Sequence, residues 1–173
     1  MRRQKKQYQG PAHPWQAARI AEEADLVKRY GLKNKKEIWR AQSKLRNWRA
    51  QARRLVGLPA EEVEGAKAAL FGRLIRLGLI TDKSSIDDIL TLGVDQVLGL
   101  RLQTSVQRKG LSTTVKQARQ FIVHKKVLVN GNVTTSPSYE VRKDDVVELL
   151  KGFEVKSPPK QQEVVEEVKK DGE

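Results

Sequence analysis

The sequence predicts an α+β fold in which a mostly helical N-terminal part precedes a small module of two helices packed on a short β-sheet with a hairpin. Two observations predict this class. Apolar residues recur every three or four positions along most of the chain before residue 125, which is the period of an α-helix. An Asn-Gly pair then stands at positions 130 and 131 between two runs rich in β-branched residues, the strongest short-range signal for a hairpin.

The N-terminal part is expected to hold a basic arm and four helices. Residues 1–14 are basic and contain Gly and Pro, which favours an arm that is extended or disordered until it binds a partner. A helix is expected over residues 15–30, ending at Gly31 as its C-terminal cap. Further helices are expected over residues 60–77 and around residues 85–92. The apolar face of the helix over 60–77 comprises Val63, Ala66, Leu70, Leu74 and Leu77.

The longest helix is expected over residues 35–56, which no Gly or Pro interrupts. Asn34 and Glu37 have the spacing of a capping box at its start. Trp39 falls outside the apolar stripe, where it either stacks on a base or sugar or packs against a neighbouring helix. The apolar stripe consists of Ile38, Ala41, Leu45, Trp48, Ala52 and Leu55. The rest of the circumference is cationic, with Lys36, Arg40, Arg46, Arg49 and Arg53.

The module is expected to begin with one helix over residues 94–109, because apolar residues recur there every four positions. These residues are Leu98, Leu102 and Val106. A second helix is expected to start at a Ser or Thr cap within residues 112–114 and to run to about residue 124. A hairpin over residues 126–135 and a strand over residues 146–150 complete the expected sheet.

The second helix of the module has two different sides on a helical wheel. Its apolar side comprises Val115, Ala118, Phe121 and Ile122. Its other side carries cationic and hydrogen-bonding groups, and comprises Lys116, Arg119, Gln120, Val123 and His124. If the apolar side packs on the sheet, the cationic side points toward a partner.

The expected organisation has four parts. They are a basic flexible arm over residues 1–14, a helical domain over residues 15–93, a module of helices and a sheet over residues 94–150 and a disordered tail over residues 151–173. The boundary between the two folded parts is placed where the short fourth helix ends.

Positive charge is concentrated in two blocks. The chain has 34 Lys and Arg against 21 Asp and Glu, a formal net charge of +13. Residues 1–56 carry sixteen basic and four acidic groups, whereas residues 101–126 carry seven basic groups and no acid. The remaining segments are each net negative. Counterion release from phosphates favours a positive block without carboxylates, so a nucleic acid is the expected partner.

Several kinds of site are disfavoured by the composition. The chain has no Cys, which excludes disulfides, thiolate zinc sites and cysteine nucleophiles, and its two His residues, His13 and His124, are far apart in sequence. We therefore expect no metal and no cofactor. No apolar run approaches the roughly 20 residues that span a bilayer, and the first residues have no signal-peptide core, so we expect a cytoplasmic protein.

The module resembles a small RNA-binding domain named after ribosomal protein S-four, which also occurs in some pseudouridine synthases and tyrosyl-tRNA synthetases. The resemblance rests on the run RLQTSVQRKGLSTTVKQARQFIVHKKVLVNGNVTTSPSYEVRKDDVVEL. Three N-terminal stretches resemble the archaeal and eukaryotic branch of small-subunit ribosomal protein S-four itself; they are HPWQAARI, YGLKNKKEIWRAQSKLRNWRAQAR and FGRLIRLGLI. The length and the short C-terminal tail favour the archaeal type.

This resemblance implies a structural protein of the small ribosomal subunit. It implies direct binding to small-subunit (16S-type) ribosomal RNA, nucleation of assembly of the subunit body, and a contact with ribosomal protein S-five that supports translational accuracy. The zinc cluster of some bacterial relatives is not expected, because the chain has no Cys. The residues that we expect to contact RNA are Arg101, Arg108, Lys109, Lys116, Arg119, Gln120, His124 and Lys125 in the module, and Lys36, Arg40, Arg46, Arg49 and Arg53 in the long helix. His124 could instead cap a helix C-terminus.

Three other functions compete with this interpretation. An RNA-modifying enzyme would need a catalytic domain, and the chain contains no P-loop, H-E-x-x-H, G-x-S-x-G or Rossmann motif, so we expect no enzyme. A non-ribosomal RNA or DNA binder is compatible with the module alone, but not with the N-terminal resemblance. Binding to an anionic membrane is disfavoured because the apolar stripes complement one another, which favours a packed core.

Overall fold

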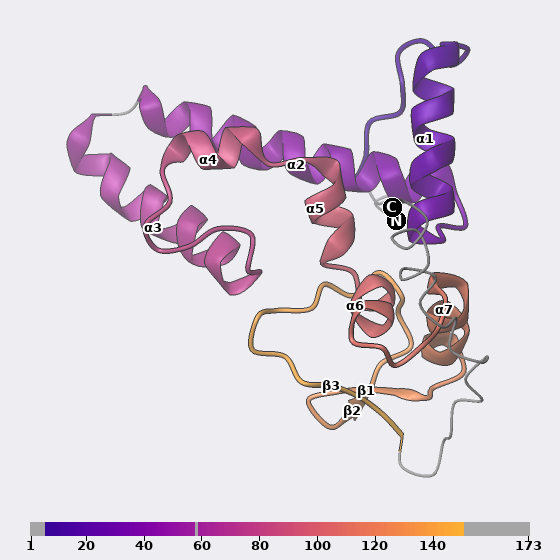
Figure 1. Cartoon of the computed structure of the whole chain (residues 1–173). Coiled ribbons are helices and arrows are strands. Elements are labelled where there is room, and N and C mark those ends of the chain that lie inside the picture. Colours follow the sequence, from indigo (N-terminus) through magenta and orange to yellow (C-terminus); the bar gives the residue numbers. More distant parts are fainter. Residues whose placement is uncertain (1–5, 58, 151–173) are drawn as a thin grey trace, which may run out of the picture.

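The computed structural model describes residues 6–57 and 59–150 of the chain. Within these residues it contains seven helices and a three-stranded antiparallel sheet, so the expected α+β class is confirmed (Figure 1). The helices are α1 (Ala17–Tyr30), α2 (Lys35–Val56), α3 (Ala60–Arg76), α4 (Ile86–Thr91), α5 (Val94–Gly99), α6 (Leu102–Arg108) and α7 (Val115–Val123). The strands are β1 (Val127–Val129), β2 (Asn132–Val133) and β3 (Val147–Leu149). Residues 1–5 of the expected arm and the whole expected tail lie outside the described residues.

Helix α2 is the central helix of the N-terminal part, and its bounds are those predicted from the sequence. Its six buried residues are the six residues of the expected apolar stripe. Helices α1, α3, α4 and α5 all contact α2, and Figure 1 shows α3 and α4 extending beside it. A first hydrophobic core lies between these helices and includes Leu45, Leu74 and Ile89. The stripe therefore did predict which face of α2 organises the N-terminal part.

The start of α2 differs from the expected capping box. The Asn34 side chain accepts no hydrogen bond from the helix, although Glu37 accepts the backbone N–H of Lys33 at 3.4 Å. The Glu37 carboxylate instead pairs with two arginines of the module. The capping box was therefore predicted wrongly for Asn34. The carboxylate half of the box is lost as well, because charge-assisted bonds from the two arginines of the module hold the Glu37 oxygens away from the backbone N–H of Asn34.

Helix α1 is joined to α2 through the buried carboxylate of Glu23. Its Oε1 accepts hydrogen bonds from Arg19 Nη1 at 2.6 Å and from Trp39 Nε1 at 2.9 Å. The Nζ of Lys35 lies 3.4 Å from Oε2. Burial raises the pKa of Glu23, but these hydrogen bonds outweigh it and hold the pKa below the ordinary value of 4.5. Trp39 thus packs between helices, and its ring also lies 5.9 Å from the ring of Tyr8.

Helix α3 buries only part of its expected apolar face. Leu70 and Leu74 are buried together with Phe71, whereas Ala66 near the start of the face is exposed. The helix ends at Arg76, and Gly78, two residues further on, has a φ of +70° that suits a residue without a Cβ. No helix within the described residues is both long and apolar enough to cross a membrane.

The single helix expected over residues 94–109 was predicted wrongly, because the chain breaks there into α5 and α6. Arg101 has an extended backbone, with φ of −66° and ψ of 140°, and bridges to Glu140 in the segment before β3. The break is held by backbone hydrogen bonds from Val141 N to Leu100 O (2.9 Å) and from Leu102 N to the carbonyl oxygen of Tyr139 (2.7 Å). These bonds replace the helical ones that the break removes.

The break directs equivalent apolar residues into two different cores. Leu98 on α5 belongs to the first core, whereas Leu102 and Val106 on α6 belong to a second core with α7 and the sheet. Ile122 of α7 and Val127 of β1 are fully buried in this second core. A continuous helix would keep all the residues of the four-residue repeat on one stripe. The apolar repeat therefore did mark buried residues, but the spacing could not show that these residues divide between two cores.

The sheet has the strand order β2-β1-β3, and both pairings are antiparallel. The expected hairpin is confirmed, since Asn130 and Gly131 both have positive φ, 51° and 78°, as a tight two-residue turn between twisted strands requires. The Asn130 side chain also joins this turn to the start of β3. Its Oδ1 accepts the backbone N–H of Val146, and its Nδ2 donates to Asp145 Oδ1, both at 2.9 Å.

We expect replacement of Asn130 by Ala to lower the free energy of unfolding by about 1 to 3 kcal/mol, because it removes two hydrogen bonds and places Ala at positive φ. Asn130→Gly should cost less, since Gly adopts this backbone freely and only the hydrogen bonds are lost. Urea denaturation of both variants measures the two contributions. Asn132→Ala, at the exposed first residue of β2, is the control and should change stability little. Equal losses in the three variants would contradict a special role for Asn130.

Candidate nucleic-acid interface

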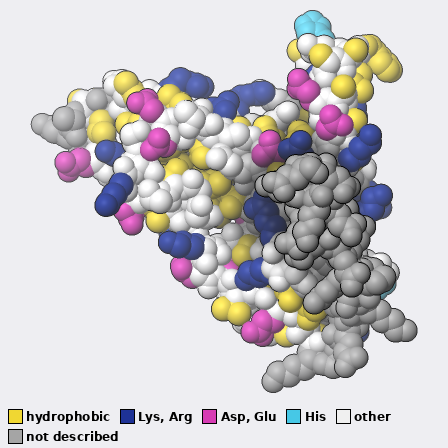
Figure 2. Space-filling model, viewed as in Figure 1, with side chains coloured by type: hydrophobic (Ala, Val, Ile, Leu, Met, Phe, Trp, Pro, Cys, Tyr) yellow, Lys and Arg dark blue, Asp and Glu magenta, His cyan; other side chains and the backbone are white. Residues whose placement is uncertain are grey.

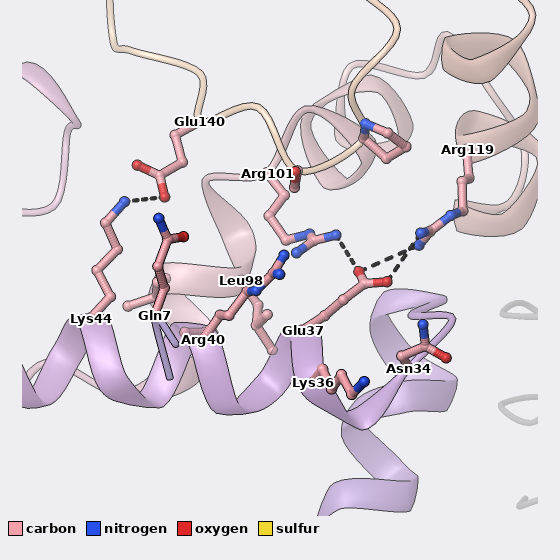
Figure 3. Close-up of a pocket in the computed structure, with 14 residues that line it drawn as sticks. Gln7, Asn34, Lys36, Glu37, Arg40, Lys44, Leu98, Arg101, Arg119 and Glu140 are labelled. Atoms are coloured by element: carbon pink, nitrogen blue, oxygen red, sulfur yellow. Dashed lines mark hydrogen bonds and ion pairs between the residues drawn. The ribbon is translucent and has the colours of Figure 1, made fainter. Parts of the chain in front are cut away.

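The helical part and the module are joined by a network of ion pairs centred on Glu37 of α2. One guanidinium nitrogen of Arg101, at the start of α6, pairs with Oε2 of Glu37. Arg119 of α7 pairs with Oε1 at 3.0 Å. Figure 3 shows the two arginines pointing from the module toward this carboxylate. All three side chains are largely shielded from solvent, with exposures of 14% for Glu37, 10% for Arg101 and 25% for Arg119. We call this set the Glu37 latch.

The latch is an ionised carboxylate held between two cations. Burial by itself raises the pKa of Glu37, but the hydrogen bond from Arg119 and the positive charges of Arg101 and Arg119 outweigh it, so the pKa lies below 4.5. Burial also lowers the pKa of Arg101, and Glu37 opposes that effect. The positive charge of Arg119 adds to the effect of burial on Arg101, so Glu37 supplies the negative charge that favours the ionised guanidinium of Arg101 in this poorly hydrated position.

Gln103 of α6 reinforces the latch through its side-chain amide, which is fully buried. Its Nε2 donates to the carbonyl oxygens of Gly31 (3.0 Å) and Val115 (2.9 Å), and its Oε1 accepts from Arg119 Nη1 at 3.3 Å. This one side chain thus joins the α1–α2 connection to the start of α7. A Cβ at Gly31 would lie 3.0 Å from Gln103 Nε2, and the φ of +55° there also favours Gly.

A pocket of about 520 Å³ opens beside the latch, between α2 and the module. We call it the junction pocket. Its ionisable lining residues are Lys36, Glu37, Arg40, Lys44, Arg101, Arg119 and Glu140, which give five positive and two negative charges and hence a net charge of +3. Lys44 pairs with Glu140 across the pocket. Lys36 and Arg40 are exposed and make no ion pair within the described part of the chain.

Most of the residues expected to contact RNA are exposed. The exposed ones are Lys36, Arg40, Arg46, Arg53, Arg108, Lys109, Lys116, Gln120, His124 and Lys125. Three others bind within the protein: Arg101 and Arg119 belong to the latch, and half-buried Arg49 donates to the carbonyl oxygen of Leu92. RNA contact stays a prediction for all of them. The positions nevertheless assign a structural role to Arg101, which is 8% exposed.

The cationic face of α7 is exposed as the wheel predicted, except at Arg119, which turns into the latch. Ala118, Phe121 and Ile122 are buried against the sheet side, and the Thr114 hydroxyl caps the helix by accepting the backbone N–H of Gln117 at 3.2 Å. His124 occupies the C-cap position of this helix and is exposed. Packing of the apolar face therefore leaves Lys116, Gln120 and Lys125 toward solvent, together with His124.

Sequence reasoning missed the roles of Glu37 and Gln103 in joining the two parts. The sequence did hold one signal for Glu37, which is the only acid between Asp25 and Glu61, in an otherwise basic stretch. An isolated carboxylate among many cations is a candidate for an internal ion pair. Gln103 had no comparable signal. Within the described residues, no group of three or more His, Asp or Glu side chains is arranged to hold a metal ion.

The sequence was compared with those of known proteins, and the matches identify its family. Residues 100–147 match the S4 domain family. The chain is 53% identical over 137 residues to the small ribosomal subunit protein uS4 of Natronomonas pharaonis, covering 78% of this chain and 79% of the relative. It is 46% identical over 147 residues to that of Nanoarchaeum equitans, with 84% and 82% covered, and 41% identical over 161 residues to that of Methanothermobacter thermautotrophicus, with 93% of each covered. The resemblance inferred from the sequence is confirmed, and the chain belongs to the small ribosomal subunit protein uS4 family.

Proposed function

We propose that this protein is a structural, non-catalytic component of the small ribosomal subunit that binds small-subunit ribosomal RNA directly. The relatives named above are small-subunit ribosomal proteins, and 34 basic residues against 21 acidic ones suit a polyanionic partner. The observation that carries the proposal is the Glu37 latch. It holds the cationic face of α2 and the cationic face of α7 in one fixed orientation.

A rigid two-part cationic surface suits a folded RNA better than a single duplex. Folded ribosomal RNA brings phosphates from several helices close together, and proteins recognise such RNA largely by shape and backbone contacts. In the helical part, Lys36 and Arg40 would contact RNA phosphates. In the module, Lys116 and Lys125 would do the same. We therefore propose that the four-part organisation serves a grip by both folded parts on one RNA junction.

The resemblance also supports two finer proposals. A protein that fixes several RNA helices relative to one another would nucleate assembly of the subunit body. A contact with ribosomal protein S-five would then bear on translational accuracy in the cytoplasm. The module leaves the large apolar side chains of Val123, Val133 and Val146 exposed by half or more, which suits a protein neighbour. After high-salt washing, an integral component should still sediment with the small subunit, whereas a loosely bound factor would be released.

We expect the double replacement Lys116→Glu and Lys125→Glu to weaken binding to small-subunit ribosomal RNA by about tenfold or more. Both side chains are exposed and make no ion pair within the described residues, so the fold should be retained. Loss of two phosphate contacts should also make the dependence of log K on log salt shallower by about 1.5. Filter binding across a salt series measures both quantities.

The matched control is Arg54→Glu with Lys83→Glu, which makes the same change in net charge away from α7. Both control residues are exposed, on α2 and between α3 and α4. An affinity loss below about threefold in the α7 variant, which is under 1 kcal/mol, would show that this face does not bind RNA. Equal losses in both variants would show a dependence on net charge alone. Arg119 is left unchanged because it belongs to the latch.

A further inference from the structure

A second basic pocket lies on the other side of the Lys44–Glu140 ion pair from the junction pocket. Its volume is about 530 Å³, and Lys44, Ser138 and Glu140 line both pockets. Figure 2 shows Lys and Arg side chains on both sides of the hollow between the helical part and the module. We call the second pocket the tyrosine pocket, after Tyr139 in its wall.

The walls of the tyrosine pocket come from both folded parts. The last turns of α3 supply Arg73 and Arg76, and the segment before β3 supplies Tyr139 and Arg142. Two backbone hydrogen bonds fix that segment: Lys143 N donates to the carbonyl oxygen of Arg76 at 3.0 Å, and Leu102 N donates to that of Tyr139 at 2.7 Å. The pocket is therefore preformed by main-chain contacts.

The charge of the tyrosine pocket is strongly positive. Lys44, Arg73, Arg76 and Arg142 face a single acid, Glu140, for a net charge of +3. Glu140 is already paired with Lys44. The three arginines are exposed and form no ion pair within residues 6–57 and 59–150, although Arg76 Nε donates to the Gly72 carbonyl oxygen at 3.0 Å. These guanidinium groups are available for an anion from outside the chain.

An aromatic ring completes the tyrosine pocket. Tyr139 is 37% exposed, and its side chain forms a hydrogen bond with Asp145 that helps to hold the pKa of that carboxyl below its ordinary value. The main hydrogen bond that lowers the pKa of Asp145 comes from the backbone of Arg142. The same carboxylate therefore holds the ring and the segment that carries Arg142. Trp48, which is 3% exposed, lies in the inner wall.

We propose that the tyrosine pocket binds one unpaired nucleotide of the ribosomal RNA. The base lies against Tyr139, and its flanking phosphates lie on Arg73, Arg76 and Arg142. Proteins recognise single-stranded RNA by stacking of splayed bases on aromatic rings, combined with cationic contacts to the backbone. A purely phosphate-binding site would not need the exposed ring. This inference rests on the proposed RNA-binding function and adds to it a discrete site, whose arginines and tyrosine come from the two segments 57–100 and 127–150 that the charge count had left net negative.

The first test compares the affinity of full-length variants for a small-subunit ribosomal RNA transcript. Tyr139→Ala should weaken binding by between about fivefold and a hundredfold, the range of a lost aromatic–base stack. Tyr139→Phe retains the ring and should stay within about twofold of the original protein. Arg73→Gln with Arg76→Gln should weaken binding and make the salt dependence shallower, whereas Arg54→Gln, outside both pockets, should change neither much.

The second test locates the contact directly. Ultraviolet irradiation of the complex, with 5-iodouridine in the RNA, should crosslink a single-stranded position to the peptide that contains Tyr139, and Tyr139→Ala should abolish that crosslink. Full affinity in Tyr139→Ala, with crosslinks only elsewhere, would overturn the pocket while leaving the proposed function intact, provided that the Lys116 and Lys125 variant still binds poorly. If the original protein does not bind the RNA, both proposals fail. Competition at this pocket by an acidic peptide without RNA crosslinking would assign it to a protein partner and overturn the nucleotide proposal.

Discussion

Replacing Glu37 by Ala is expected to lower the free energy of unfolding by about 3 to 5 kcal/mol, the range for removing one partner of a buried ion pair. The change leaves Arg101 and Arg119 close together without the carboxylate between them, and Arg101 is too buried for water to replace it. Glu140, the other acid near Arg101, is already paired with Lys44. Urea denaturation measures the loss. Glu22→Ala on α1, an exposed acid, is the control and should change stability by less than about 0.5 kcal/mol.

The contribution of Glu37 should also depend on pH in a defined direction. Its pKa in the folded protein lies below 4.5, so the folded state favours the ionised carboxylate more than the unfolded state does. The stabilisation is therefore fully present above pH 4.5 and is lost as the pH falls through the lower folded-state pKa. The stability difference between the original protein and Glu37→Gln should be constant near neutral pH and shrink in acid. A difference that grew in acid would contradict an ionised latch.

Neutralising both cationic faces at once is expected to weaken binding to small-subunit ribosomal RNA by about a thousandfold at 0.1 M salt, if each lost charge removes one phosphate contact. The variant carries Lys36→Gln and Arg40→Gln on α2 with Lys116→Gln and Lys125→Gln on α7. All four side chains are exposed, so the effect should fall on binding and not on the fold. The slope of log K against log salt should become shallower by about 3.

The α2 pair and the α7 pair measured separately would test whether both folded parts bind. Each pair alone should account for roughly half of the loss in binding free energy. The latch holds both faces in position before RNA binds, so the contacts of one face do not depend on those of the other. A matched control neutralises four exposed cations elsewhere: Lys28, Arg54, Lys67 and Lys83. An α2 pair that bound RNA as well as the original protein would confine RNA binding to the module. If the control variant bound RNA as weakly as the test variant, the loss would depend on net charge alone and not on where the charges lie.

Local patterns in the sequence predicted the elements whose residues make their own contacts. The bounds and buried face of α2 followed from a long run without Gly or Pro and from a regular apolar repeat. The turn at Asn130 and Gly131 followed from residues that tolerate positive φ. The cationic side of α7 followed in the same way, because its apolar side specified which residues would be buried.

The repeat through Leu98 and Leu102 shows where such patterns stop. A spacing of four residues is the same whether one helix carries it or two helices share it, and only the packing partners differ. Here the segment before β3 forms hydrogen bonds to Leu100 and Leu102 and turns the chain at Arg101. Those partners lie about 40 residues further along the chain, outside any local window.

The sequence alone determined that this protein is cationic in two blocks, contains a long amphipathic helix and has a module with a hairpin after its helical part. Its motifs also determined the family. Only the tertiary structure decided which cations are free. A basic residue looks the same in a sequence whether it faces solvent or an internal carboxylate, so Arg101 and Arg119 could not be distinguished from Lys116. Folding brings Glu37 to the first two, and it brings Arg73, Arg76 and Tyr139 from different segments into one pocket, because contacts between distant segments decide burial and pairing.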